Sequence, residues 1–116
     1  MLTSSIPVLR SSDYAQTRSF LTDVLGFSVV EEGGDPARFG IFRRDKATVF
    51  ADAWHGADIE PSPGWRAYFH VKDVDAFAAG LNWPEVEGPS DAVYGMREIV
   101  VTDPDGNRLC FGMDIA

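Results

Sequence analysis

The sequence predicts an α+β fold in which one βαβββ module occurs twice in tandem within a single domain, residues 1–116. The main observation is internal similarity. Residues 6–21 and 66–81 both show a strand-like apolar run, an aspartate at a helix start and an apolar stripe. Three further strand-like runs follow each predicted helix. We expect the modules at about 1–56 and 65–116, joined by a linker at 57–64 that carries two prolines.

In the first module, the opening strand is expected at 6–10. Ser12 or Asp13 can cap the helix that follows, because their side chains accept hydrogen bonds from free N–H groups of the first turn. The helix should run to about Leu25 and end at Gly26. Strands are then expected at 27–32, 38–43 and 47–54.

In the second module, a strand is expected at 66–72, followed by a helix that Asp73 can cap and that ends near Leu81. A short strand near 85–87 and longer ones at 96–102 and 108–113 should follow. The last two are separated by Asp-Pro-Asp-Gly-Asn at 103–107, a strong hairpin signal.

Each module has one helix, which cannot cover both faces of its sheet. Two modules, from one chain or from two, should therefore pair into an eight-stranded, curved and cupped mixed sheet with the helices outside. Alternate strand residues would line its concave face. An ordinary α+β domain without internal symmetry is the alternative.

Successive side chains of a strand point to opposite faces of the sheet, so the residues that alternate with the helix-packing row should face the concavity. In the strand at 66–72, Ala67 and Phe69 belong to the apolar row that packs on the helix, so their neighbours point the other way. Aromatic rings with a few charges are typical of a small-molecule pocket, although the same aromatic residues could simply form core. The expected concave set is Phe50, Asp52, Trp54, Arg66, Tyr68, His70, Tyr94 and Glu98.

Composition excludes several classes of protein. The net charge is −8 and no cluster of Lys and Arg is present, so we expect no nucleic-acid partner. No apolar run approaches the ~18 residues that span a bilayer, and no signal-peptide pattern opens the chain, so we expect no membrane association. Cys110 is the only cysteine, which excludes an intramolecular disulfide and fits a reducing, cytoplasmic location.

The doubled module, Leu25-Gly26-Phe27 after the first helix and the turn at 103–107 together resemble the vicinal oxygen chelate superfamily over nearly the whole chain. That superfamily includes glyoxalase I, extradiol dioxygenases, fosfomycin-resistance enzymes and bleomycin-resistance proteins. Its enzymes hold a divalent metal, and the resemblance places the three ligand positions at Ile6, Arg66 and Cys110. Isoleucine has no donor atom, arginine is a fixed cation and a lone cysteine is a soft ligand.

We therefore expect no metal, no cofactor and no catalytic residue. The alternative is a replacement metal site made by His70 and Asp52 with Glu98 or Cys110.

The segments 2–9, 22–28 and 39–45 resemble the bleomycin-resistance branch in particular. This likeness implies a homodimer that exchanges its N-terminal strands and binds drug in aromatic clefts at the dimer interface. By position, Phe39, Tyr68 and Tyr94 would line those clefts, with Asp52 nearby. A planar, cationic antibiotic such as a bleomycin would meet aromatic faces, carboxylates and an attractive net charge.

The expected function is thus non-catalytic sequestration of a hydrophobic or cationic antibiotic-like molecule. A rival hypothesis is a glyoxalase-superfamily enzyme of the lyase, isomerase or dioxygenase type, with a non-standard metal site or none and with Glu98 or His70 as general base. A purely structural or partner-binding module is the third.

Overall fold

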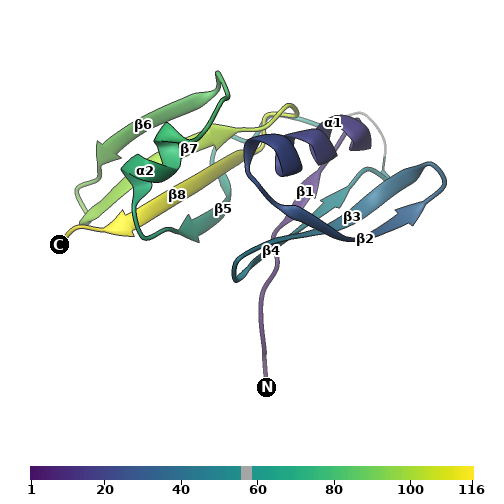
Figure 1. The fold of residues 1–116 in the computed structure, drawn as a ribbon, viewed down its shortest axis with the longest axis horizontal. Coiled ribbons are helices and arrows are strands. Elements are labelled where there is room, and N and C mark those ends of the chain that lie inside the picture. The colour runs from purple at the N-terminus through teal and green to yellow at the C-terminus, as the bar shows by residue number, and fades with distance from the viewer. Residues whose placement is uncertain (56–58) are drawn as a thin grey trace. The chain divides into compact units, whose positions relative to one another are not determined.

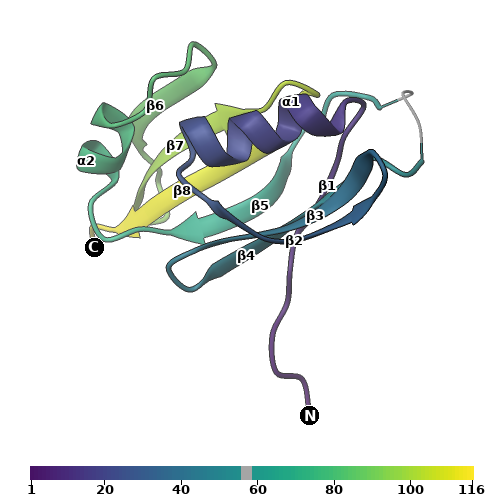
Figure 2. The same ribbon diagram turned by 45° about the vertical axis from the view of Figure 1, so that its right-hand side comes forward.

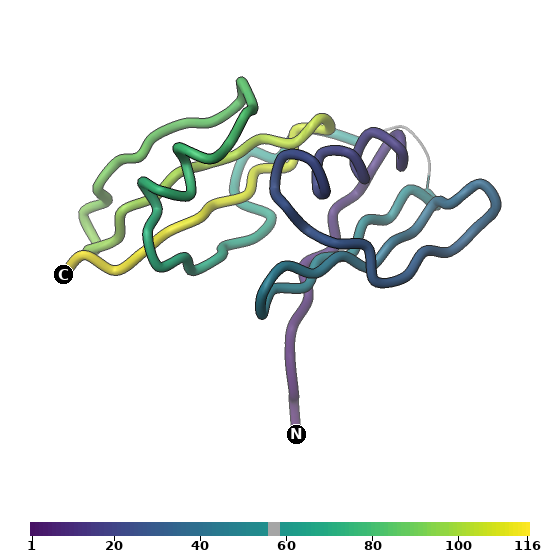
Figure 3. Tube along the Cα trace, viewed as in Figure 1, coloured from purple at the N-terminus to yellow at the C-terminus, as the bar shows by residue number. Residues whose placement is uncertain are grey.

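The computed structural model describes residues 1–55 and 59–116, so the start of the predicted linker 57–64 lies outside the described residues. The chain divides into two compact units, Met1–Glu60 and Pro61–Ala116. Figure 3 shows that the chain completes the strands of the first unit before it begins those of the second. No helix in the described part of the chain is long and apolar enough to cross a membrane.

Each unit contains one βαβββ module, which confirms the predicted α+β fold class and the internal repeat (Figure 1). The elements of the first unit are β1 (Val8–Arg10), α1 (Tyr14–Ser19), the π-helix η1 (Phe20–Val24), β2 (Ser28–Gly34), β3 (Ala37–Arg44) and β4 (Ala47–Asp52). Those of the second are β5 (Trp65–His70), α2 (Val74–Ala79), β6 (Val86–Asp91), β7 (Met96–Thr102) and β8 (Arg108–Asp114).

The two four-stranded sheets have the same topology. Their strand orders are β1-β4-β3-β2 and β5-β8-β7-β6, and in both the first strand pairs in parallel with the last while the other pairs are antiparallel (Figures 1 and 2). All strand pairs between described residues lie within one unit. The joining of the modules into one eight-stranded cupped sheet therefore stays a prediction.

Both helices begin at the aspartates that the sequence indicates. The Asp13 carboxylate accepts a hydrogen bond from the backbone N–H of Gln16, and Asp73 accepts one from that of Ala76. The first helix continues as η1 and ends before Gly26, whose φ of +71° suits glycine. The second helix ends at Ala79, two residues earlier than expected. The N–H of Gly80 donates hydrogen bonds to the backbone carbonyls of Ala76 and Phe77 and so closes the last turn.

In the first unit, one face of the sheet packs on the helix and forms the core. Leu9, Phe42 and Ala51 are fully buried on this face. The ring of Tyr14, on α1, lies 6.3 Å from that of Phe42 on β3. The opposite face carries Phe39 and its neighbours of the same parity, and we call it the open face of this sheet.

In the second unit, an aromatic stack joins α2 to the sheet. The ring of Phe111 on β8 stacks on Phe69 of β5 with centroids 4.9 Å apart, and it lies 4.7 Å from Phe77 of α2. Leu109, Ile99 and the other buried residues of this parity share the helix face. Tyr68 and Glu98 have the opposite parity and lie on the open face of this second sheet.

Several strands differ by one to four residues from the predicted bounds; β1, for example, begins at Val8 and β5 ends at His70, and two of the differences have local reasons. The strand expected at 85–87 extends through Val86–Asp91, because a bulge between Glu87 and Ser90 lets it pass Pro89, which has no N–H to donate. The strand expected at 47–54 ends at Asp52, whose carboxylate accepts a hydrogen bond from the N–H of Trp54 and turns the chain.

The predicted hairpin turn at 103–107 is confirmed. The buried Asp103 carboxylate accepts hydrogen bonds from the backbone N–H of Asp105 at 2.9 Å and of Asn107 at 2.8 Å, and from the side-chain amide of Asn107. Gly106 has a φ of +83°. The turn thus satisfies its own buried polar groups as it leads into β8.

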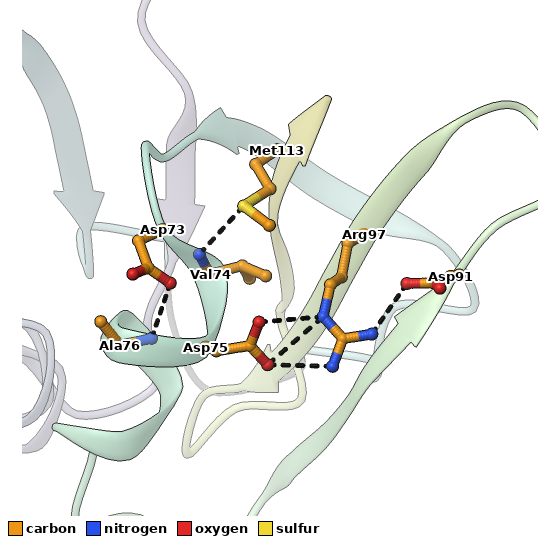
Figure 4. Close-up of polar contacts among 7 residues, drawn as sticks. All are labelled: Asp73, Val74, Asp75, Ala76, Asp91, Arg97 and Met113. Atoms are coloured by element: carbon orange, nitrogen blue, oxygen red, sulfur yellow. Dashed lines mark hydrogen bonds and ion pairs between the residues drawn. The ribbon is translucent and has the colours of Figure 1, made fainter. Parts of the chain in front are cut away.

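Arg97 of β7 fastens α2 to the sheet (Figure 4). Its guanidinium donates to Asp75 on the helix at 2.9 and 3.0 Å, and to Asp91 on β6 at 2.8 Å. Hydrogen bonding to Arg97 lowers the pKa of Asp75 below its ordinary value. A carboxyl group whose pKa is lowered by folding stabilises the folded state above its unfolded-state pKa and loses this effect as the pH falls.

We therefore expect Asp75→Asn to lower the melting temperature by about 2 °C near neutral pH, because an exposed pair contributes little. The difference from the unmodified protein should shrink as the pH falls through the carboxyl range. Thermal unfolding followed by circular dichroism measures both effects, with Asp35→Asn, at an exposed position, as the control. An Asp75→Asn deficit that grows in acid would contradict this interpretation.

Candidate functional site

The residues predicted to form the site fall into two groups, one in each unit. Phe39, Phe50, Asp52 and Trp54 belong to the first unit. Arg66, Tyr68, His70, Tyr94 and Glu98 belong to the second.

In the first unit, β3 and β4 bring two phenylalanines and a carboxylate together. Phe39 and Phe50 meet edge to face, with centroids 5.3 Å apart and an interplanar angle of 66°. Phe39 also lies opposite Asp52 in the strand register. The Asp52 carboxylate lies 3.2 Å from Nδ1 of His55, so this group combines apolar rings with one negative charge.

Trp54 lies beyond the end of β4, in the turn that follows, and not within the strand where it was expected. Its ring is 43% exposed, and the guanidinium of Arg38 lies 4.3 Å from its centroid, a cation–π contact. Sequence parity missed His55, which the turn after Asp52 brings beside that carboxylate, and the same turn places the Trp54 ring against Arg38 of β3.

In the second unit, Tyr94 and Glu98 form the best-defined polar contact. The Tyr94 hydroxyl lies 2.7 and 2.8 Å from the two carboxylate oxygens of Glu98. Glu98 is only 8% exposed, whereas Tyr94, in the loop between β6 and β7, is 59% exposed. This hydrogen bond, with some burial, raises the pKa of Tyr94 to about 12.

Tyr68 lies across β8 against Gly112. A Cβ atom at Gly112 would collide with the Tyr68 hydroxyl, so glycine is needed for the ring to lie there. Burial, and then the neighbouring Glu98 carboxylate, raise the pKa of Tyr68. The hydroxyl lies near Glu98 but outside good hydrogen-bond geometry, and it is buried without a partner among the described residues.

A bulge in β5 changes which residues join Tyr68. The register shifts between Trp65 and Ala67, and the Trp65 ring comes to lie 5.2 Å from Tyr68, with 48% of the residue exposed. His70 lies 5.3 Å from Tyr68 on the other side, as alternation predicts. Arg66, which was expected in this group, sits in the bulge and has no hydrogen bond or ion pair recorded within residues 1–55 and 59–116. The sequence gives no signal for a bulge here, so Trp65 was missed.

The family model for the Glyoxalase/Bleomycin resistance protein/Dioxygenase superfamily matches residues 5–111, and the chain belongs to that superfamily. Among curated proteins, none matches the chain.

Solved structures share the fold at low sequence identity. A bleomycin resistance determinant encoded on the transposon Tn5 has a TM-score of 0.80 and 20% identity, covering 99% of this chain and 100% of that one. TnmS3, an antibiotic binding protein from Streptomyces sp. CB03234, has a TM-score of 0.74 and 22% identity, covering 98% of both chains. A lactoylglutathione lyase from Agrobacterium tumefaciens has a TM-score of 0.72 and 20% identity, covering 96% and 92%.

The side chains at the three positions where the resemblance places metal ligands do not fit a metal. Ile6 and Arg66 offer no lone pair, and burial together with the Glu98 charge raises the pKa of Cys110 to about 12, which keeps the thiol protonated. In the described part of the chain, no three His, Cys, Asp or Glu side chains gather closely enough to hold a metal ion. Within the second unit, His70, Glu98 and Cys110 form no such group; Asp52 belongs to the first unit, so the replacement site stays a hypothesis.

We predict that protein purified without chelator carries far less than one metal ion per chain, as measured by elemental analysis. Added zinc, manganese or nickel should leave the melting temperature unchanged, because only a ligand that binds the folded state raises it. Tightly held metal near one ion per chain would contradict this prediction and would favour the rival hypothesis of a metal-dependent enzyme.

Proposed function

We propose that this protein is a non-catalytic binding protein that sequesters a flat, aromatic, antibiotic-like molecule, hydrophobic or cationic, as a cytoplasmic homodimer. The observation that carries the proposal is the open face of the second sheet. There the ring of Tyr68 contacts those of Trp65 and His70, and the exposed Tyr94 hydrogen-bonds to a buried carboxylate, Glu98. Aromatic faces with few polar groups suit a planar ligand.

Three further observations support this reading. The first unit supplies a second aromatic group, in which Phe39 and Phe50 meet beside Asp52. The net charge of −8 attracts cationic molecules from a distance, with a strong dependence on salt. Structures with the same fold include proteins described as binding bleomycin and as binding antibiotics.

Calorimetric titration with bleomycin and a panel of flat aromatic antibiotics tests the proposal. We expect saturable binding that Tyr68→Ala and Phe39→Ala each weaken by about 1–3 kcal/mol, because each removes a ring from an open face. Val30→Ala, at an exposed position of β2, is the control and should bind normally.

The fate of the ligand separates binding from catalysis. Chromatography should recover the ligand chemically unchanged after prolonged incubation with the protein. A ligand that is converted, with a turnover that Glu98→Gln abolishes, would replace this proposal with an enzyme that uses Glu98 as general base. Absence of binding across the whole panel would overturn the proposal.

The homodimer has its own test, because strand exchange was implied by family resemblance alone. Sedimentation should report a particle of about twice the 12.7 kDa chain mass. A stable monomer would remove the dimer from the proposal and leave ligand binding to the single chain.

A further inference from the structure

Glu98 is a buried carboxylate without a cationic partner. It is 8% exposed, and no ion pair joins it to a basic side chain in residues 1–55 and 59–116. Two nearby arginines are engaged elsewhere: Arg97, next to Glu98 on β7, pairs with Asp75 and Asp91, and Arg108 on β8 pairs with Glu87. Burial of a carboxylate is costly unless hydrogen bonds or an opposite charge compensate for it.

The group that now compensates Glu98 is held loosely. Both of its oxygens lie within hydrogen-bond distance of one hydroxyl, that of Tyr94. Tyr94 is 59% exposed and stands in the loop just before Gly95, whose φ is +86°. Because most of this ring is in water, rotation of the side chain away from Glu98 would break the hydrogen bond and little packing.

The surroundings of Glu98 suit a cation better than a neutral group. The ring of Tyr68, whose hydroxyl lies near the carboxylate, is 5.2 Å from that of Trp65 and 5.3 Å from that of His70 on the same open face, and aromatic faces attract ammonium groups. The Tyr68 hydroxyl is buried near the carboxylate and lacks a hydrogen-bond partner among the described residues. A ligand bound here can therefore meet a negative charge, ring faces and one unused hydroxyl.

We propose that the Tyr94 hydroxyl is a placeholder on Glu98, and that the protonated amine of an aromatic ligand displaces it. Glu98 then selects for an organic monocation. The strength of the Tyr94–Glu98 hydrogen bond sets how much binding free energy the cation must supply to displace the hydroxyl. This inference rests on the proposed function, because it requires that the open face of the second sheet binds an aromatic molecule.

Three indole probes with the same ring test the charge preference: tryptamine carries a cation, tryptophol is neutral and indole-3-propionate carries an anion. Affinities are measured by NMR titration of the intact protein. We expect tryptamine to bind about tenfold more tightly than tryptophol, and indole-3-propionate more weakly than either. Glu98→Gln should remove the preference for tryptamine while tryptophol binding stays within about twofold.

Tyr94→Phe tests the placeholder, since it keeps the ring and removes only the hydroxyl. It should strengthen tryptamine binding by about fivefold, leave tryptophol unchanged, and give no gain when combined with Glu98→Gln. Glu85→Gln, which removes an equal charge at an exposed position of the same unit, is the matched control and should change nothing beyond about twofold.

The outcomes separate this inference from the proposed function. Equal binding of tryptamine and tryptophol, unaffected by Glu98→Gln, would overturn the inference and leave aromatic binding standing. If none of the indoles and none of the antibiotics binds, both fail. If Glu98→Gln does not fold, Tyr94→Phe decides alone: a gain confined to tryptamine supports the placeholder, and no gain overturns it.

Discussion

Replacing Phe111 by alanine is expected to lower the free energy of unfolding by about 4 kcal/mol. Phe111 is 3% exposed and lies in contact with Phe69 on β5 and Phe77 on α2. Its removal leaves a cavity and separates the helix from the sheet. Since α2 spans only six residues, it is too short to persist without this packing. Urea denaturation followed by circular dichroism measures the loss.

Phe111→Leu is the matched variant, because it keeps most of the apolar volume. It should cost about 1 kcal/mol, and hydrogen exchange of the α2 amides should accelerate strongly only in the alanine variant. An alanine variant within about 1 kcal/mol of the unmodified protein would show that the aromatic stack does not hold the helix in place.

Gly40→Ala is the second large effect, at about 3 kcal/mol, and it arises from overpacking. A Cβ at this position of β3 would overlap the Tyr14 hydroxyl and lie 2.6 Å from the Phe42 ring. Both neighbours are buried, and the Tyr14 hydroxyl donates a hydrogen bond to Glu32 at 2.5 Å. The added methyl group must displace the helix residue or the core ring.

Gly33 on β2 provides the control, because a Cβ there meets nothing within 4 Å. Gly33→Ala should therefore change the free energy of unfolding by no more than about 0.5 kcal/mol. Tyr14→Phe introduced together with Gly40→Ala should recover part of the loss, because it removes the hydroxyl that the methyl group meets. A double variant no more stable than Gly40→Ala would indicate that the strain lies at Phe42.

Local chemistry explains which parts of the fold could be predicted. Asp13, Asp73 and the turn at 103–107 act within a few residues of themselves, so their signals are complete in the sequence. The extension of β6 past Pro89 depends on a bulge against β7. A bulge is set by the partner strand, which no local pattern contains.

The sequence likewise predicts some residues of the candidate site and not others. Strand alternation placed Tyr68 and Glu98 on one face, and the structure agrees on the parity of both. It missed Trp65, which the β5 bulge brings beside Tyr68, and it does not apply to Trp54, which lies in a turn after β4. Hydrogen bonds such as that of Tyr94 with Glu98 depend on loop geometry, which periodicity does not describe.

The bulges in β2 and β6 have a consequence for self-association. Each strand forms an outer edge of its sheet, where unpaired N–H and C=O groups could recruit a strand from another chain. The β2 edge carries Glu31 and Glu32 with two register shifts, and the β6 edge carries Glu87, Pro89 and a third. Carboxylates, proline and broken register all oppose strand addition, so these two edges resist the cross-β stacking that leads to amyloid.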